Sequence, residues 1–160
     1  MLFEKLSINY DDLKQARKKN LFLDIIKKQL LQQTMAYQET INKMIESNNY
    51  LDVEQELVLL YDNIIKGNFE EATLVMEKLD SNHYQFSQME KLFYMYLVTL
   101  YYYSTNQIIM AYRQVKVLIN ERIDEEVLYW VVFELSMCIH FLIGKFNTYI
   151  KDYMRFIKDA

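Results

Sequence analysis

The sequence has no proline and only two glycines, Gly67 and Gly144, among its 160 residues. Proline and glycine are the residues that most often form hairpin turns and long loops, so their scarcity excludes a fold rich in β-hairpins. Leucine, lysine, glutamine, glutamate and methionine, which favour helices, are plentiful instead. We therefore predict an all-α protein.

Cysteine and long apolar runs are also scarce. The lone Cys138 rules out an intramolecular disulfide, and residues 1–5 do not have the basic and apolar layout of a secretory signal. The longest weakly charged stretch, residues 92–119, is interrupted by polar side chains and favours two buried helices over a membrane span. We expect a cytoplasmic protein without a membrane segment.

The chain lacks a strong excess of either charge, since 18 Lys and Arg stand against 22 Asp and Glu, a net charge of -4. The charge is unevenly placed, with a small basic excess in residues 1–49 and an acidic excess in residues 50–160. A modest basic cluster in residues 14–28 fits either a solvated helix face or contact with DNA phosphates. Because nucleic-acid-binding domains usually carry a stronger basic face, we favour the solvated face and do not expect direct nucleic-acid binding.

Motifs for common enzyme chemistry are missing. The sequence has no P-loop, no dinucleotide-binding glycine pattern, no nucleophile elbow and no Cys-x-x-Cys pair. His83 and His140 do not have metal-ligand spacing, and Cys138 would point away from His140 on a helix. Acidic pairs such as Glu70–Glu71 open expected helices, where the helix dipole explains them. We predict no catalytic residue, no metal, no cofactor and no enzymatic activity.

Apolar residues recur at three- and four-residue steps along most of the chain, which is typical of amphipathic helices. Asp52 is a candidate N-cap, Ser87 and Glu90 form a capping-box pattern, and Gly67 and Gly144 stand where left-handed residues end helices. The predicted helices cover residues 10–19, 21–46, 51–66, 69–80, 88–104, 107–121, 125–143 and 145–158.

An internal repeat relates three predicted turns. Residues 67–72 align with residues 106–111 and 144–149, at spacings of 39 and 38 residues. This register aligns Ile64, Tyr103 and Phe141, and each unit is a helical hairpin that stacks on its neighbour to bury its apolar faces. We predict one domain, residues 1–160, with divergent N-terminal helices in 1–49 and three helical-hairpin repeats in 50–160. A short α-solenoid is favoured, with a generic antiparallel bundle as the alternative.

The segment Gly67-Asn68-Phe69-Glu70-Glu71-Ala72 resembles the G-x-F/Y-x-x-A turn and second helix of tetratricopeptide repeats. The likeness covers these six residues well and the other two units partly. The period exceeds the 34 residues of that repeat, and its Trp-Leu-Gly first helix and closing proline are missing. The resemblance implies a degenerate tetratricopeptide-like array of antiparallel helical hairpins over residues 50–160.

Helical repeats rich in Tyr, Asn, Lys and Ile also resemble the C-terminal peptide-sensing domains of the Rgg/PlcR/PrgX group of cytoplasmic regulators in Gram-positive bacteria. That resemblance implies a peptide as the ligand and a role in a peptide-responsive transcriptional circuit. Those regulators carry an N-terminal helix-turn-helix domain, and residues 1–49 lack a convincing helix-turn-helix pattern. The resemblance therefore implies that a partner supplies any DNA-binding part.

Aromatic side chains concentrate in the middle hairpin, where a helix with aromatics on every side is either central or presents some of them outward. Tyrosine is a frequent interface anchor. Asn63, Tyr102 and His140 share one column of the register and are predicted to line a concave surface. The candidate partner-binding residues are Asn63, Tyr96, Tyr102, Tyr103 and His140.

Two functions remain open at this point. The first is a protein- or peptide-binding module built from helical repeats. The second is a homo-oligomerising structural or scaffold domain, in which an apolar terminal helix forms the interface through Tyr149, Tyr153 and Phe156.

Overall fold

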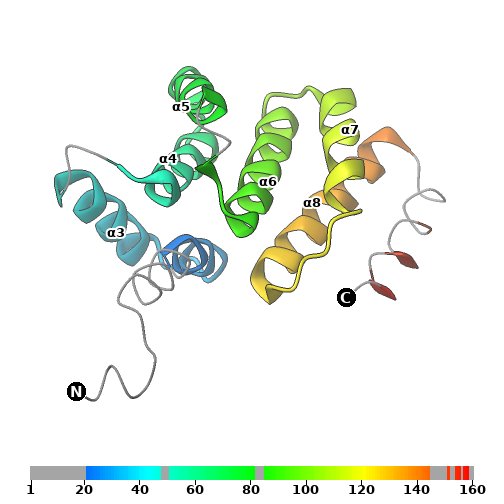
Figure 1. Cartoon of the computed structure of the whole chain (residues 1–160), viewed down its shortest axis with the longest axis horizontal. Coiled ribbons are helices and arrows are strands. Elements are labelled where there is room, and N and C mark those ends of the chain that lie inside the picture. Colours follow the sequence, from blue (N-terminus) through cyan, green and yellow to red (C-terminus); the bar gives the residue numbers. More distant parts are fainter. Residues whose placement is uncertain are drawn as a thin grey trace, which may run out of the picture. The chain divides into compact units, whose positions relative to one another are not determined.

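A computed structural model describes residues 21–47, 51–81 and 85–144, together with residues 151, 154, 155, 157 and 158. Regular structure in these residues is helical and includes no strand, so the predicted all-α fold is confirmed (Figure 1). The predicted helix at 10–19 and most of that at 145–158 lie outside the described residues. The helices are residues 21–30, α3 Thr34–Ser47, α4 Val53–Ile65, α5 Phe69–Ser81, α6 Gln88–Ser104, α7 Ile108–Leu118 and α8 Glu126–Ile143.

The chain divides into two compact units, residues 1–58 and residues 59–160. In the first unit, Lys28 Nζ donates to Thr40 Oγ1 at 2.8 Å and so joins helix 21–30 to α3. The Phe22 N–H donates to a carboxylate oxygen of Glu54 at 3.2 Å. Glu54 is only 2% exposed, and its carboxylate accepts this backbone N–H.

The predicted continuous helix over residues 21–46 is wrong, because the helix stops at residue 30 and α3 begins at Thr34. Gln32 has a φ of +55°, in the left-handed region. A residue in this conformation ends a helix and reverses the chain. The sequence gives no sign of the break, because Gln32 is a good helix former and neither glycine nor proline stands nearby.

In the second unit, α6 contacts α7 and α8, and α7 contacts α8. Consecutive helices alternate in direction from α6 to α8 (Figure 1). Between α5 and α6, the hydroxyls of Thr73 and Tyr101 are 3.0 Å apart, and the Tyr101 ring meets Phe69 edge to face at 6.2 Å. The fully buried apolar side chains of this core include Leu60, Ala72, Phe93, Leu97, Ala111, Val115, Leu118, Leu128, Val132 and Ile139.

The caps expected from the sequence are present. The Ser87 side chain accepts from the Glu90 N–H at 3.2 Å, while the Glu90 carboxylate accepts from the Ser87 N–H at 2.9 Å. Asp52 and Gln55 exchange the same two bonds at the start of α4. Each pair satisfies two backbone donors at a helix N-terminus, which fixes where the helix begins.

The three turns that the sequence register aligns share one backbone geometry. Gly67, Asn106 and Gly144 have φ values of +77°, +62° and +74°. Each N–H bonds the carbonyl three residues back, and at the first two turns the next N–H bonds a carbonyl five residues back, at 2.8 Å. This is the Schellman motif, which satisfies the last carbonyls of a helix. Gln32 and Gln33 make the same two bonds.

Replacing Gly67 by alanine is expected to lower the free energy of unfolding by about 1–2 kcal/mol. An added Cβ at Gly67 would meet no atom within 4 Å, so the whole cost comes from the left-handed backbone. Urea denaturation followed by far-UV circular dichroism measures it. Asn106→Gly is the matched control and should change stability in the opposite direction, by up to about 1 kcal/mol. A neutral Gly67→Ala would contradict the expected strain.

Candidate binding groove

The α6 helix has apolar side chains on every side, and the neighbouring helices cover only some of them. Leu92, Phe93, Tyr96 and Leu97 are buried, whereas Met95, Val98 and Tyr102 are half-buried along one face. These three residues, with Lys91, follow the i, i+4, i+7, i+11 spacing of a single helical stripe. The stripe lies between residues contributed by α5 and α7 and forms the floor of a hollow.

Two adjoining cavities lie over this stripe. The first has a volume of about 470 Å³ and is lined by Asp80, Phe86, Lys91, Tyr94 and Met95. The second, of about 280 Å³, shares three of these residues and is lined by Met76, Asp80, Tyr94, Met95, Val98, Tyr102 and Gln114. Because they share a wall, we treat the two cavities together as the α6 groove.

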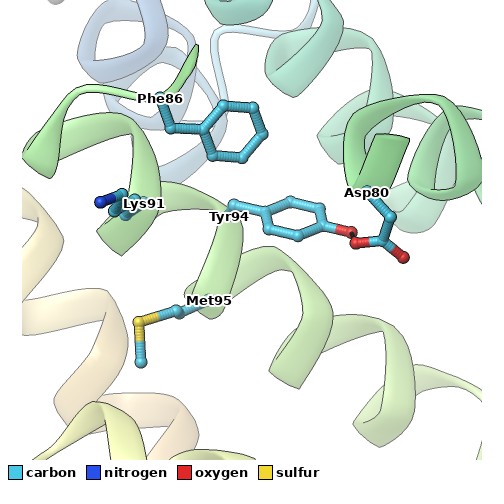
Figure 2. Close-up of a pocket in the computed structure, with 5 residues that line it drawn as sticks. All are labelled: Asp80, Phe86, Lys91, Tyr94 and Met95. Atoms are coloured by element: carbon cyan, nitrogen blue, oxygen red, sulfur yellow. Dashed lines mark hydrogen bonds between the residues drawn. The ribbon is translucent and has the colours of Figure 1, made fainter. Parts of the chain in front are cut away.

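A hydrogen-bonded pair, Tyr94 and Asp80, stands where the two cavities meet (Figure 2). The Tyr94 hydroxyl donates to the Asp80 carboxylate and lies 3.4 Å from the Met76 carbonyl oxygen. Burial raises the pKa of Tyr94 well above its ordinary value, and the bond to Asp80 and its negative charge raise it further. Tyr94 therefore stays protonated at neutral pH and remains a donor to the carboxylate.

The Tyr94 ring is held in place by Phe86, whose ring it meets edge to face at 5.5 Å. Figure 2 shows Lys91 and Asp80 on opposite sides of Tyr94, with Phe86 and Met95 bordering the same space. The groove thus combines apolar walls with one cationic and one anionic group. Two methionines, Met76 and Met95, add flexible walls that adapt to ligands of different shape.

The groove lining is mainly apolar, with a few polar groups. Its lining includes no cysteine, serine or histidine that would act as a nucleophile or base. Among the residues that the structure describes, no three His, Cys, Asp or Glu side chains gather closely enough to hold a metal ion. An apolar side chain with polar groups beside it is the ligand that this lining suits.

Of the five predicted partner-binding residues, Tyr102 lines the groove. Asn63 and Tyr103 are half-buried in α4 and α6. Tyr96, at 6% exposure, and His140, at 1%, lie in the core instead of on a partner-facing surface. The His140 ring is held there by a 2.8 Å bond between Nδ1 and the Ser136 carbonyl and by an edge-to-face contact with Tyr112. The predicted interface residues Tyr149, Tyr153 and Phe156 lie outside the described residues.

Most of the groove was missed by sequence reasoning. The spacing of Lys91, Met95, Val98 and Tyr102 on one helix face was a usable signal for its floor. Asp80 and Gln114 come from neighbouring helices, and Phe86 comes from a connecting segment. Only the packing of the helices brings them to the same place, so no local pattern identifies them.

Within the described residues, α8 is long and apolar enough to cross a membrane, with a mean hydropathy of 1.7 over Glu126–Ile143. Buried core helices pass the same test, and 39% of this segment is buried against the rest of the protein. Leu128, Val132 and Ile139 are in fact fully buried. The absence of a membrane segment stays a prediction.

No protein-family model, curated protein or solved structure matches this chain.

Proposed function

We propose that this protein is a binding module whose α6 groove takes a short extended segment of a peptide or partner protein. The observation that carries the proposal is the pair of adjoining cavities with apolar walls and the Tyr94–Asp80 pair between them. A volume of about 470 Å³ lies within the range of ligand-binding pockets. No enzymatic role is proposed.

The lining favours a particular kind of segment. An apolar anchor side chain would fill the space between Phe86 and Met95, with the Tyr102 ring available to a second one. The Gln114 side-chain amide offers a donor and an acceptor to the backbone of an extended chain. A cationic group near Asp80 and an anionic group near Lys91 would set the direction in which the segment lies.

The resemblance to tetratricopeptide repeats and to peptide-sensing regulators supports the same proposal. In that setting the protein would be a cytoplasmic α-solenoid in a peptide-responsive transcriptional system, with DNA contact left to a partner. The shared geometry of the turns at Gly67 and Asn106 is consistent with repeated hairpins.

A peptide-display selection on the purified protein tests the proposal. We expect enriched peptides to share an apolar anchor, and Val98→Glu to weaken their binding by at least ~tenfold in fluorescence anisotropy because it puts a charge on the groove floor. Leu74→Glu is the control, since Leu74 is 58% exposed on α5 and does not line the groove. Circular dichroism verifies that both variants fold.

Tyr94→Phe gives a second readout, because it keeps the ring and removes the bond to Asp80. We expect it to change the preference for charged residues beside the anchor more than it changes binding of the anchor itself. Selections that yield no shared anchor would refute the proposal, as would peptides that bind Val98→Glu and wild type equally.

A further inference from the structure

The α8 helix carries large apolar side chains on two opposite sides. Its core side is buried, yet Trp130, Met137 and Phe141 are 53%, 43% and 64% exposed. Their spacing of seven and four residues places them along one stripe of the helix, here named the α8 face. The Trp130 ring is fixed by edge-to-face contacts with Tyr129 at 5.4 Å and Phe133 at 5.8 Å. The face is therefore a rigid aromatic surface.

The internal register shows how the equivalent face of α6 is used. The α6 residues Leu92, Thr99 and Tyr103 lie 38 residues before Trp130, Met137 and Phe141, in that order. Leu92 is 3% exposed, Thr99 is fully buried, and the Tyr103 side chain lies close to Cys138 of α8. Since α6 and α8 are in contact, this face of α6 belongs to a helix-packing interface within the chain. The α8 face repeats its position and has the apolar character of such an interface.

The charges around the α8 face point to what would cover it. Glu126 and Glu134 lie exposed on the same side of α8 as Trp130. Later in the chain, Lys151, Arg155 and Lys158 are exposed and helical, at the four- and three-residue steps of one helix side. Met154 and Ile157 beside them are 52% and 43% exposed. The chain thus has two exposed apolar surfaces. The α8 face is bordered by acidic side chains, and the surface at Met154 and Ile157 is bordered by basic ones.

A chain that carries both halves of a complementary pair can bind its own copy through a two-fold axis. We propose that the α8 face binds a second copy of this chain, in a symmetric dimer in which the acids of one copy meet the bases of the other. In this dimer the α8 face of each copy packs against the exposed Met154, Ile157 and basic side chains of the other copy. This proposal shares no residue with the α6 groove and does not depend on it.

Trp130 makes the test direct, because it is the only tryptophan in the chain. Sedimentation velocity and tryptophan emission are recorded on the full chain from about 1 to 300 µM, a range that covers weak and moderate dimers. We expect a shift from monomer to dimer with rising concentration, and a matching blue shift of the emission as the indole leaves water.

Phe141→Glu and Met137→Glu should each weaken the dimer at least ~tenfold, because each buries a charge in the apolar part of the face. Ile109→Glu is the control, since Ile109 is 61% exposed on α7 and should leave the dimer intact. Melting curves check that each variant folds. A protein that stays monomeric throughout, or a dimer that both α8 substitutions leave unchanged, would overturn the proposal.

The same emission measurement with phosphatidylcholine vesicles tests whether the apolar α8 face binds lipid instead of a second copy. A blue shift of Trp130 that requires vesicles while the protein in solution stays monomeric would also overturn the dimer. A blue shift that follows protein concentration without vesicles supports it.

Discussion

Replacing Phe93 by alanine is expected to lower the free energy of unfolding by about 3–5 kcal/mol. Phe93 is 1% exposed and lies on α6, the helix that contacts both α7 and α8. Removing its ring leaves a cavity that neighbouring helices fill only in part. Because domains of this size are usually stable by about 5–15 kcal/mol, the loss takes away much of the total.

Urea denaturation followed by circular dichroism measures this effect, with Leu74→Ala as the comparison. Leu74 is 58% exposed on α5, so its truncation should cost within about 0.5 kcal/mol. A Phe93→Ala protein as stable as Leu74→Ala would show that α6 is not central to the core.

Stability is expected to fall steeply between pH 10 and pH 12. Burial, helped by the charge of Glu134, raises the pKa of Tyr61 from 10.0 to about 12. Burial likewise raises the pKa of Tyr96 well above its ordinary value. Unfolded tyrosines ionise near pH 10, so above it the unfolded chain releases protons that the folded protein keeps. Rising pH therefore favours unfolding, and the stability that Tyr61 contributes below pH 10 is lost by pH 12.

The loss from Tyr61 alone amounts to about 3 kcal/mol, since each pKa unit is worth about 1.4 kcal/mol. Urea denaturation at a series of pH values from 8 to 12, with phenolate absorbance as a second probe, measures the loss. Tyr61→Phe cannot ionise at this position, so its stability should fall less over the same range while its melting remains cooperative. Equal slopes for Tyr61→Phe and wild type would contradict the assignment to Tyr61.

Helix positions were largely predictable because their signals are local. The predicted helix at 88–104 coincides with α6, whose start is fixed by the Ser87–Glu90 capping box. The turn at Asn106 was found without a glycine, by alignment with Gly67. The turn at Gln32 was missed because glutamine favours helices and the residue nonetheless has a left-handed backbone.

The candidate site was less predictable, since polarity is a poor guide to exposure on a helix as apolar as α8. There the polar Ser136 and His140 are buried, each bonded within the helix, while Trp130 and Phe141 are exposed. The sequence register predicted His140 on a concave surface, in one column with Asn63 and Tyr102. Tyr102, predicted to bind a partner, lines the groove, and its role in binding stays a prediction. Asp80 and Gln114 could be placed only from the positions of α5 and α7.

The short Schellman turns also shape how the second unit folds. Only residues 66–68 separate α4 from α5, and only residues 105–107 separate α6 from α7. Closing such short connections costs little chain entropy, and α6, α7 and α8 meet partners that are their neighbours in sequence. A topology dominated by local contacts folds quickly, so the chain exposes its many aromatic side chains to aggregation only briefly.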